Sequence, residues 1–351
     1  FHMKTKENLY KTLDFFMLRT PVLPIEEFAK CFPTCVGEDE NVREVTLNHL
    51  SEWSNNPFIR EALAASSPTL LESLLHISNS DNPRKQGQVI KAFMRYIIRM
   101  MTRPTPFGLL SGVTYGQFTE QSQLCLQGTD TYQKRARPDM EWLLKVMELI
   151  EGRKEVILQL KVQRNTLIYR QGNRAKIPYT TRHGSMVDGE DQSVSVRTTQ
   201  VFDCVMDVSS VPIPYLELVD HLQKEFVGAN SETVDRYVWQ LFEQEFLISE
   251  LIPPTTTPDP LNHILSTLKH VTGMDEFKQK LIYIADAIHE YNGLPIGQGE
   301  EYLAELRRYM DDMFSVKSSL QIDLSMEDRG MSLPHAIRKD VERVADLLTK
   351  L

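Results

Sequence analysis

The chain has 351 residues, of which 41% are hydrophobic and 25% charged, as is typical of a globular protein with two or three domains. Its formal net charge of −9 argues against a protein that coats nucleic acid non-specifically, so binding of a polyanion would require a local basic patch. The 4 cysteines form no CxxC pair and the 9 histidines show no metal-ligand spacing, so we expect no metal, no bound cofactor and a reduced, cytoplasmic protein.

The first predicted elements lead into an Arg-Thr-Pro corner. Residues 9–18 form an apolar and aromatic run that predicts a strand, and Arg19-Thr20-Pro21 follows it directly. Residues 42–78 have helical periodicity with breaks before Pro57 and before Pro68, and Ser66 or Ser67 can cap the helix that follows the second break. The N-terminal part is therefore expected to contain one strand and several short helices.

The central stretch of the sequence is residues 91–113, KAFMRYIIRMMTRPTPFGLLSGV. Its first half predicts an amphipathic helix, because apolar residues recur every three to four positions. Arg95, Arg99 and Arg103 are spaced four apart, so their guanidinium groups lie along a second face, and Pro104 ends the helix. Such a basic helix, running into a rigid Pro-Thr-Pro corner, can present fixed donors to a phosphate or carboxylate. The alternative is a core helix whose arginines are simply solvated.

Two further elements complete this part of the chain. Residues 114–127 alternate loosely between apolar and polar side chains and predict a strand. Arg137-Pro138-Asp139 then begins a helix, because proline fits the first helical turn. The carboxylate of Asp139 either stabilises the positive end of the helix dipole or takes part in a functional site, and the spacing leaves both interpretations open.

The composition changes after Gly152 and predicts a second kind of unit. Short strands are expected at 156–162, 166–170, 175–180, 194–197 and 201–205, with a polar loop at 183–192. Helices at 214–226 and 231–246 and a strand at 247–251 follow. This order of two helices and a strand is the outline of a winged helix.

The second helix of this predicted winged helix is acidic. Glu232, Asp235, Glu243 and Glu245 would repel phosphate groups, and Arg236 is its only basic residue. We therefore expect a unit that docks a peptide rather than one that binds DNA. An extended peptide would add to the strand edge at 247–251. The residues expected to contact it are Tyr237, Leu241, Leu247, Ile248 and Ser249.

The last part of the chain is mainly helical and follows a proline-rich linker at 252–260. Helices are expected at 261–271, 274–291, 300–314 and 334–351, with a lone strand at 319–325 that carries Asp323. An aspartate within an apolar strand is more often paired with an arginine than catalytic. Taken together, the elements predict an α+β fold of mixed helices and small antiparallel sheets. The expected parts are 1–155, the winged-helix-like peptide-binding unit within 156–254, and 255–351.

Three segments together resemble the N-terminal part of the class I lantibiotic dehydratases. They are FFMLRTP at 15–21, RPTPFGLLSG at 103–112 and RPDMEWL at 137–143, and their order and spacing agree along residues 1–150. After Asp139 the resemblance rests on architecture more than on individual residues. It implies the N-terminal part of a tRNA-dependent glutamylation domain, either of a full-length dehydratase or of the split, thiopeptide type.

Members of that family take glutamate from glutamyl-tRNA and esterify serine and threonine hydroxyls of a ribosomal precursor peptide. A separate C-terminal domain then eliminates glutamate to leave dehydroalanine or dehydrobutyrine. The resemblance implies that glutamyl-tRNA is the co-substrate and that the leader of the precursor peptide binds the winged-helix-like unit. The residues that it carries over to the glutamylation site are Arg19, Arg99, Arg103, Thr105, Asp139 and, supported only by its place in a strand, Asp323. Arg95 is not part of the match.

The resemblance also indicates which partners the protein could have and what the chain can do alone. A cyclase, a separate elimination protein and a second copy of the chain are further candidate partners, and a biosynthetic complex could hold the protein peripherally at a membrane. Because the chain is much shorter than members of the family, we expect it to bind peptide but not to transfer glutamate alone. A non-catalytic peptide-binding module or scaffold of a peptide-modifying complex is the main alternative. A transcriptional regulator is a third hypothesis, which the acidic helix disfavours.

Overall fold

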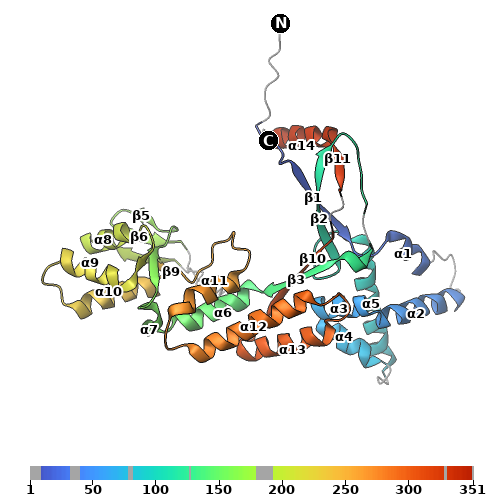
Figure 1. Ribbon diagram of the computed structural model, residues 1–351, viewed down its shortest axis with the longest axis horizontal. Helices are drawn as coiled ribbons and strands as arrows, with labels where there is room; N and C mark the ends of the chain where they lie inside the picture. The colour runs from blue at the N-terminus through green and yellow to red at the C-terminus, as the bar shows by residue number, and fades with distance from the viewer. Residues whose placement is uncertain are drawn as a thin grey trace, which may run out of the picture. The chain divides into compact units, whose positions relative to one another are not determined.

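The computed structural model describes residues 9–31, 40–77, 82–125, 128–178, 193–327 and 330–349 (Figure 1). Helices and small sheets are mixed along the chain, which confirms the predicted α+β class. The polar loop expected at 183–192 lies outside the described residues.

The chain forms two compact units. The first contains Phe1–Ala136, His289–Leu306 and Gln321–Leu351, and the second contains Arg137–Ile288 and Arg307–Leu320. This arrangement differs from the expected division at 155 and 254. The first boundary lies between Ala136 and Arg137, and the last third of the chain contributes segments to both units.

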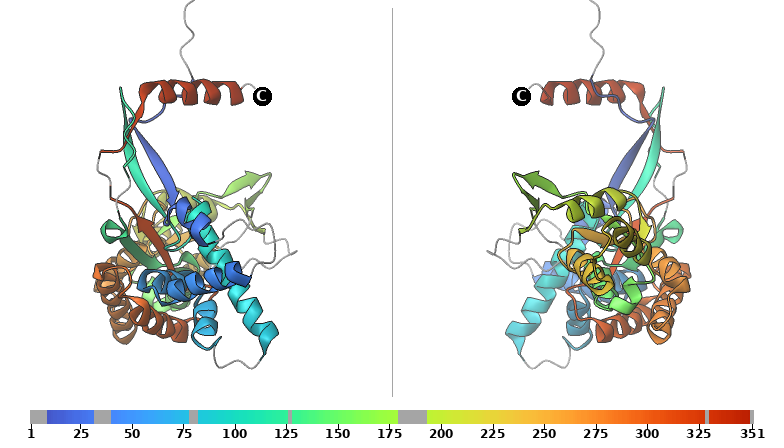
Figure 2. Two further views of the ribbon diagram at one scale, coloured as in Figure 1. Left: turned by 90° about the vertical axis from the view of Figure 1, so that its right-hand side faces the viewer. Right: turned by 90° about the vertical axis from the view of Figure 1, so that its left-hand side faces the viewer.

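The first unit is built on a five-stranded sheet with the order β1-β2-β10-β3 and with β11 also paired to β2. β1 (Phe15–Pro21) is antiparallel to β2 (Ser111–Thr119), and β10 (Leu320–Ser325) and β11 (Ser332–Pro334) are parallel to β2. β3 (Gln133–Pro138) lies on the far side of β10. Figure 2 shows the ribbon that β1 and β2 form together. The segment expected as a lone strand is therefore an internal strand of a mixed sheet.

The two faces of this sheet differ in burial. Thr114 in β2 and Ile322 and Leu324 in β10 lie on one face and are buried. Phe15, Met17 and Tyr115 lie on the other face and are 47–50% exposed. Since side chains of a strand alternate between faces, the sheet has one core side and one open side.

The helices of the first unit confirm the predicted breaks. They are α1 (Ile25–Cys31), α2 (Glu40–Asn55), α3 (Pro57–Ser66), α4 (Pro68–Leu75) and α5 (Pro83–Thr102), followed near the C-terminus by α14 (His335–Leu348). Pro57, Pro68 and Pro83 each occupy the first turn of a helix, where the missing N–H has no cost. Phe93 and Ile97 of α5 are buried, which confirms the apolar face of the central helix. The Leu23 N–H donates to the Met100 carbonyl at 2.8 Å and joins the exit of β1 to α5.

The second unit contains the winged-helix-like arrangement. Its helices are α6 (Met140–Glu151), α7 (Lys154–Ile157), α8 (Gln200–Val208), α9 (Tyr215–Glu225) and α10 (Ser231–Glu243). A small antiparallel sheet has the order β8-β4-β9, from β8 (Ile213–Pro214), β4 (Lys161–Arg164) and β9 (Leu247–Ser249). A second small sheet is formed by β5 (Tyr169–Gln171), β6 (Arg174–Ile177) and β7 (Val194–Arg197).

Two strand predictions in this unit are wrong. Residues 201–205 lie in α8, because Thr199 caps the helix through the Phe202 N–H, and Phe202 and Val205 recur at helical spacing on its buried side. Residues 156 and 157 belong to the short helix α7, so the following strand begins only at Lys161. In both places a short run rich in valine was ambiguous between strand and helix.

The remaining helices are α11 (Pro260–Thr267), α12 (Asp275–Gly293) and α13 (Glu300–Met313), close to the predicted ranges. Within the second unit, Trp142 of α6 is completely buried and its indole N–H donates to the Met310 carbonyl at 3.1 Å. The Trp142 and Phe314 rings meet edge to face with centroids 5.8 Å apart. Over the described ranges, no helix has the length and apolar character needed to cross a membrane.

A buried carboxylate joins several segments of the first unit. Glu61 in α3 is completely buried, and one oxygen accepts from Lys134 Nζ at 2.5 Å and from the Tyr291 hydroxyl at 2.9 Å. Its other oxygen accepts from the backbone N–H groups of Gly297 and Gly299 at 2.6 and 3.0 Å. A Cβ atom on Gly299 would lie 2.5 Å from Lys134 Nζ, so only glycine fits there. Burial lowers the pKa of Lys134, and its hydrogen bond to Glu61 opposes that shift.

The buried pair is expected to matter far more than a surface pair. Glu61→Ala should lower the free energy of unfolding by ~3–5 kcal/mol, because it leaves Lys134 buried without its counter-ion. Urea unfolding measures this value. The control is Glu148→Ala, which removes a surface carboxylate 2.8 Å from Lys145 and should cost about 0.5 kcal/mol or less. Similar small losses for both variants would contradict the structural role of Glu61.

Candidate functional site

The last two turns of α5 and the corner after them line a pocket of about 470 Å³. Its lining residues are Arg95, Tyr96, Ile98, Arg99, Thr102, Arg103 and Phe107. Arg95 and Arg99 lie one turn apart on the same side of α5, and Arg103 is the residue that ends the helix, so three guanidinium groups line one pocket. The two predicted site residues Arg99 and Arg103 share this pocket with Arg95, which was not part of the resemblance to the dehydratase family. We call it the arginine pocket.

Arg99 is held in place by the corner that follows the helix. Its Nη2 atom lies 3.5 Å from the carbonyl oxygen of Thr105, and its Cζ atom lies 4.8 Å from the centre of the Phe107 ring. The Nε–H of Arg99 is buried and has no hydrogen-bond partner among the described residues. A donor of this kind is costly to leave unpaired, which favours an anionic ligand at this position.

The Thr105 corner is fixed to the start of β2. The Thr105 carbonyl also accepts from the Ser111 hydroxyl at 2.6 Å, and Leu109 and Leu110 between them are completely buried. Gly108 has a φ of 55°, a backbone conformation that glycine adopts without strain. The corner therefore has its own anchors and can hold the Arg99 guanidinium in a constant direction.

The strand register places Arg19 and Asp323 on one face of the sheet. Arg19 pairs with Val113 of β2, and Val113 pairs with Ser325 of β10. Directly paired residues share a face, and Asp323 precedes Ser325 by two residues, so its side chain lies on that face too. Ser111, whose hydroxyl binds the corner, is also on this face, because it precedes Val113 by two residues. Arg19, Asp323 and Ser111, which holds the Thr105 corner, thus lie on one face of the sheet, which we call the Arg19 face.

Asp139 lies in the second unit and caps α6. Its carboxylate accepts from the Glu141 N–H at 2.9 Å, and its own N–H donates to the Ser319 carbonyl at 2.9 Å. The helix-terminal interpretation left open by the sequence therefore describes this side chain in the structure. A role of Asp139 in chemistry stays a prediction.

All charged residues of α5, the helix that carries most of the arginine pocket, are basic. The sequence of α5, PRKQGQVIKAFMRYIIRMMT, contains no aspartate or glutamate. Within the described part of the chain, no carboxylate forms an ion pair with Arg95, Arg99 or Arg103. In a protein of net charge −9, this helix is the local basic patch that binding of a polyanion requires.

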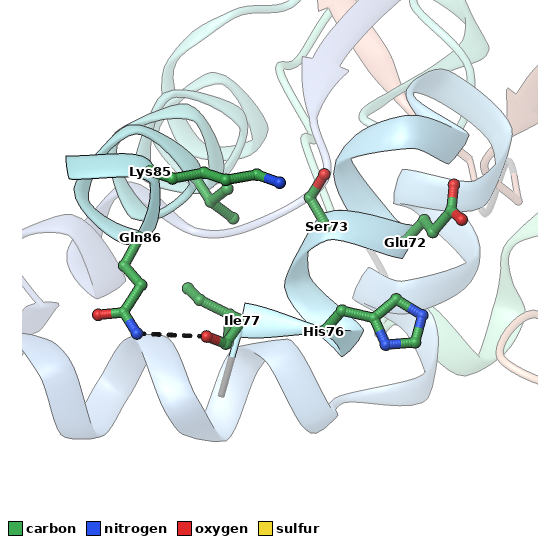
Figure 3. Close-up of a pocket in the computed structure, with 7 residues that line it drawn as sticks. Glu72, Ser73, His76, Ile77, Lys85 and Gln86 are labelled. Carbon is green, nitrogen blue, oxygen red and sulfur yellow. Dashed lines mark hydrogen bonds between the residues drawn. The ribbon is translucent and has the colours of Figure 1, made fainter. Parts of the chain in front are cut away.

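A second hollow lies between α4 and α5 and is less suited to an anion (Figure 3). It has a volume of about 260 Å³. Figure 3 shows Lys85 and Gln86 projecting from α5 opposite Ser73, with Gln86 bonded to the Ile77 carbonyl at 3.4 Å. Glu72 also lines this hollow, so its charge is mixed and it offers no guanidinium group.

The predicted peptide-binding residues surround β9 in the second unit. Leu241 and Leu247 are buried, so their side chains are core residues and cannot contact a peptide in this conformation. The Ser249 hydroxyl is also buried and donates to Glu151 at 2.6 Å. Tyr237 and Ile248 are partly exposed. Burial raises the pKa of the Tyr237 hydroxyl.

One edge of the β9 backbone pairs with no strand of the described residues, and we call it the open edge. β9 is the terminal strand of the order β8-β4-β9, and Ile248 pairs with Gln163. The Glu250 N–H donates to the Lys161 carbonyl, and the Asn165 N–H donates to the Phe246 carbonyl. Because hydrogen-bonded pairs alternate along an antiparallel ladder, the pair between these two, Gln163–Ile248, is hydrogen-bonded as well. The Ile248 N–H therefore points to β4. The N–H groups of Leu247 and Ser249 point away from β4, but both residues are buried, with 0% and 3% of their surface exposed.

Some residues of the candidate site were not identified from the sequence. Arg95 was excluded although its spacing to Arg99 was noted, and that spacing was the available signal. Phe107 and Ser111 were missed because their contacts depend on how the Thr105 corner folds back. No local pattern encodes those contacts.

Comparison with known proteins gives consistent results. The chain is 28% identical over 346 residues to the subtilin biosynthesis protein SpaB of Bacillus subtilis, covering 98% of this chain and 32% of that protein. It is 25% identical to the epidermin biosynthesis protein EpiB of Staphylococcus epidermidis, covering 97% of this chain and 33% of that protein. The chain thus spans about a third of the length of these curated relatives.

Solved structures share the fold. The tRNA-dependent lantibiotic dehydratase MibB from Microbispora sp. 107891 superimposes with a TM-score of 0.75 at 24% identity, over 97% of this chain and 31% of that chain. The glutamylation domain TbtB from thiomuracin biosynthesis gives a TM-score of 0.59 at 17% identity, over 85% of this chain and 36% of that chain. The sequence model of the family described as lantibiotic dehydratase, N terminus, matches residues 55–351. The chain therefore belongs to the lantibiotic dehydratase family, of which it carries the N-terminal region.

Proposed function

We propose that this chain is part of an enzyme that transfers glutamate from glutamyl-tRNA to serine and threonine hydroxyls of a ribosomal precursor peptide. Membership of the dehydratase family and the shared fold with a glutamylation domain support this proposal. The single observation that carries it is the arginine pocket, where the buried Nε–H of Arg99 lacks a protein partner within the described residues. No cofactor is invoked, since glutamyl-tRNA supplies the activated glutamyl ester.

The proposed chemistry is an acyl transfer that needs positioning and charge stabilisation. The peptide hydroxyl attacks the carbonyl carbon of the glutamyl ester, the bond to the tRNA 3′ oxygen breaks, and the hydroxyl proton passes to that oxygen. Arg99 and Arg103 would bind a phosphate near the 3′ end or the glutamyl carboxylate, as planar forks that two oxygens can meet. Arg19 and Asp323 share the Arg19 face with Ser111, which holds the Thr105 corner, and are proposed to border the reacting groups.

The peptide would bind elsewhere on the same chain. We propose that the precursor leader adds as a strand to the open edge of β9, where the N–H groups of Leu247 and Ser249 point away from β4 and where the leader would have to displace the groups that bury these two residues. For the whole assembly we propose that glutamate is eliminated in a later step. We also propose three possible partners, which are a cyclase, a separate elimination protein and a second copy of the chain. Because the chain spans about a third of its curated relatives, we expect it to bind peptide without transferring glutamate on its own.

The alternative function is a non-catalytic peptide-binding module, which the open edge of β9 favours. The two functions differ in what they require of α5. A scaffold does not need three arginines around one pocket without carboxylate partners in the described part of the chain. Mutation of the pocket therefore separates them.

Arg103→Lys tests the arginine pocket. In a full-length dehydratase that contains this chain, the change keeps the charge but loses the planar fork, and we expect at least a ~10-fold loss of glutamyl transfer. The measurement is mass spectrometry of glutamylated precursor, beside the thermal midpoint and leader affinity. Arg84→Lys, on the same helix outside the pocket, is the matched control and should retain activity. Near-normal transfer by a folded Arg103→Lys protein would mean that the corner is structural only.

Backbone hydrogen exchange tests the peptide edge. Addition of a leader peptide to the 351-residue chain should slow exchange of the Leu247 and Ser249 amides by roughly 10-fold or more, because they gain ladder hydrogen bonds. The Ile248 amide is the internal control, since it already faces β4. A leader that binds without protecting Leu247 or Ser249 would place the peptide at another surface.

A further inference from the structure

Helix α14 is attached to the first unit by its polar side. Arg338, Glu342 and Asp346 are each four residues apart, and they form hydrogen bonds to the segment 9–14 at distances from 2.7 to 3.2 Å. The hydrogen bonds from Thr12 lower the pKa of Glu342, so the attachment uses the charged carboxylate. An amphipathic helix usually packs by its apolar side, so this orientation is unusual.

The apolar side of α14 is left open. Ile337, Val341, Val344 and Leu348 are 41%, 50%, 54% and 63% exposed, and α14 contains no buried residue. At about 100° per residue, these four side chains fall within roughly 60° of one another around the helix axis. They form one continuous stripe, which we call the α14 stripe. Figure 2 shows α14 lying across the end of the β1–β2 ribbon.

The ribbon that carries α14 has an exposed apolar surface of its own. Phe15, Met17 and Tyr115 lie on the Arg19 face, and the Phe15 and Tyr115 rings meet edge to face at 5.9 Å. Leu13, which precedes them, is 66% exposed. Aliphatic and aromatic side chains grouped in this way are typical of a surface that another polypeptide covers.

We propose that the α14 stripe is the docking surface for the part of the glutamylation domain that lies outside the region matched by this chain. The chain covers only 36% of the TbtB glutamylation domain, so such a domain contains much further polypeptide that must pack on something. The stripe contains no charged residue, as suits a permanent contact within one domain. The proposal rests on family membership and does not depend on glutamyl transfer.

The charge of α14 argues against a membrane as the occupant. Its polar residues Arg338, Lys339, Asp340, Glu342, Arg343 and Asp346 carry as many acidic as basic groups. Helices that lie on anionic membranes instead have a polar face rich in lysine and arginine. A second copy of the chain is the other occupant that the experiment must separate.

The test compares one substitution in two settings. In the first, the 351-residue chain is studied alone, and in the second it replaces the matched region of SpaB, which is 32% of that protein. Val341→Glu should lower the thermal midpoint of the fusion by ~2 °C or more and that of the chain alone by less than about 1 °C, since Val341 is already exposed there. Val227→Glu, at a side chain that is 92% exposed, is the matched control and should change neither.

Hydrogen exchange and size measurements complete the test. Amides of α14 should exchange at least ~10-fold more slowly in the fusion than in the chain alone, while those of Phe93 and Ile97 in α5 report that both are folded. Equal exchange of α14 in two folded proteins would overturn the proposal. A chain that dimerises alone, and that Val341→Glu makes monomeric, would assign the stripe to a second copy and also overturn it.

A fusion that does not fold is replaced by co-expression of the chain with the remaining part of SpaB as a separate polypeptide. Wild type and Val227→Glu should then co-purify with it, and Val341→Glu should not. Failure of the wild type to co-purify, or equal retention of Val341→Glu, would overturn the docking surface. These readouts involve no glutamylation, so their failure is distinct from failure of the proposed function.

Discussion

The pairing of β1 and β10 with β2 decides where the candidate site can lie. Because Arg19 pairs with Val113 and Val113 with Ser325, residues separated by some three hundred positions in the chain reach one face of the sheet. A shift of one residue in either pairing would move Arg19 or Asp323 to the core side. Close packing helps to hold this register, since a Cβ atom on Gly112 would lie 2.6 Å from the Met326 side chain.

The arginine pocket depends on the same strand. β2 begins at Ser111, whose hydroxyl holds the Thr105 carbonyl, and that carbonyl faces the Arg99 guanidinium. The sheet, the corner and the helix are therefore one mechanical unit within the first part of the fold. An anion bound by Arg99 would be linked to the sheet that carries Arg19 through the Thr105 carbonyl and the Ser111 hydroxyl. Such fixed donors are what an acyl transfer stabilised by charge requires.

Much of this arrangement could be predicted from the sequence. The helix breaks at Pro57 and Pro68, the apolar face of α5 and the arginine spacing all follow from local periodicity and from proline chemistry. The pairing partner of β10 could not be predicted, because a parallel pairing leaves no mark in the strand itself. The direction of the Ile248 N–H depended on the ladder register in the same way, and residues 201–205 were assigned to a strand because valine is common in both structures.

The two units carry different recognition chemistry. The first presents guanidinium groups and no ion-paired carboxylate at its described pocket, which suits a polyanion. The second presents an acidic helix, α10, and an open backbone edge at β9, which suits an extended peptide. The two surfaces belong to different units, so each can be tested separately.

The most direct test of the arginine pocket is the salt dependence of tRNA binding by the 351-residue chain. A plot of the logarithm of affinity against the logarithm of salt concentration reports how many phosphates the protein neutralises. Arg99→Gln should weaken binding and reduce the slope by about 1, the effect of losing one phosphate contact. Arg343→Gln, a surface arginine beside Asp340 on α14, should leave affinity and slope unchanged. If Arg99→Gln binds tRNA with the affinity and slope of the wild type, the pocket does not hold a phosphate and the central claim is contradicted.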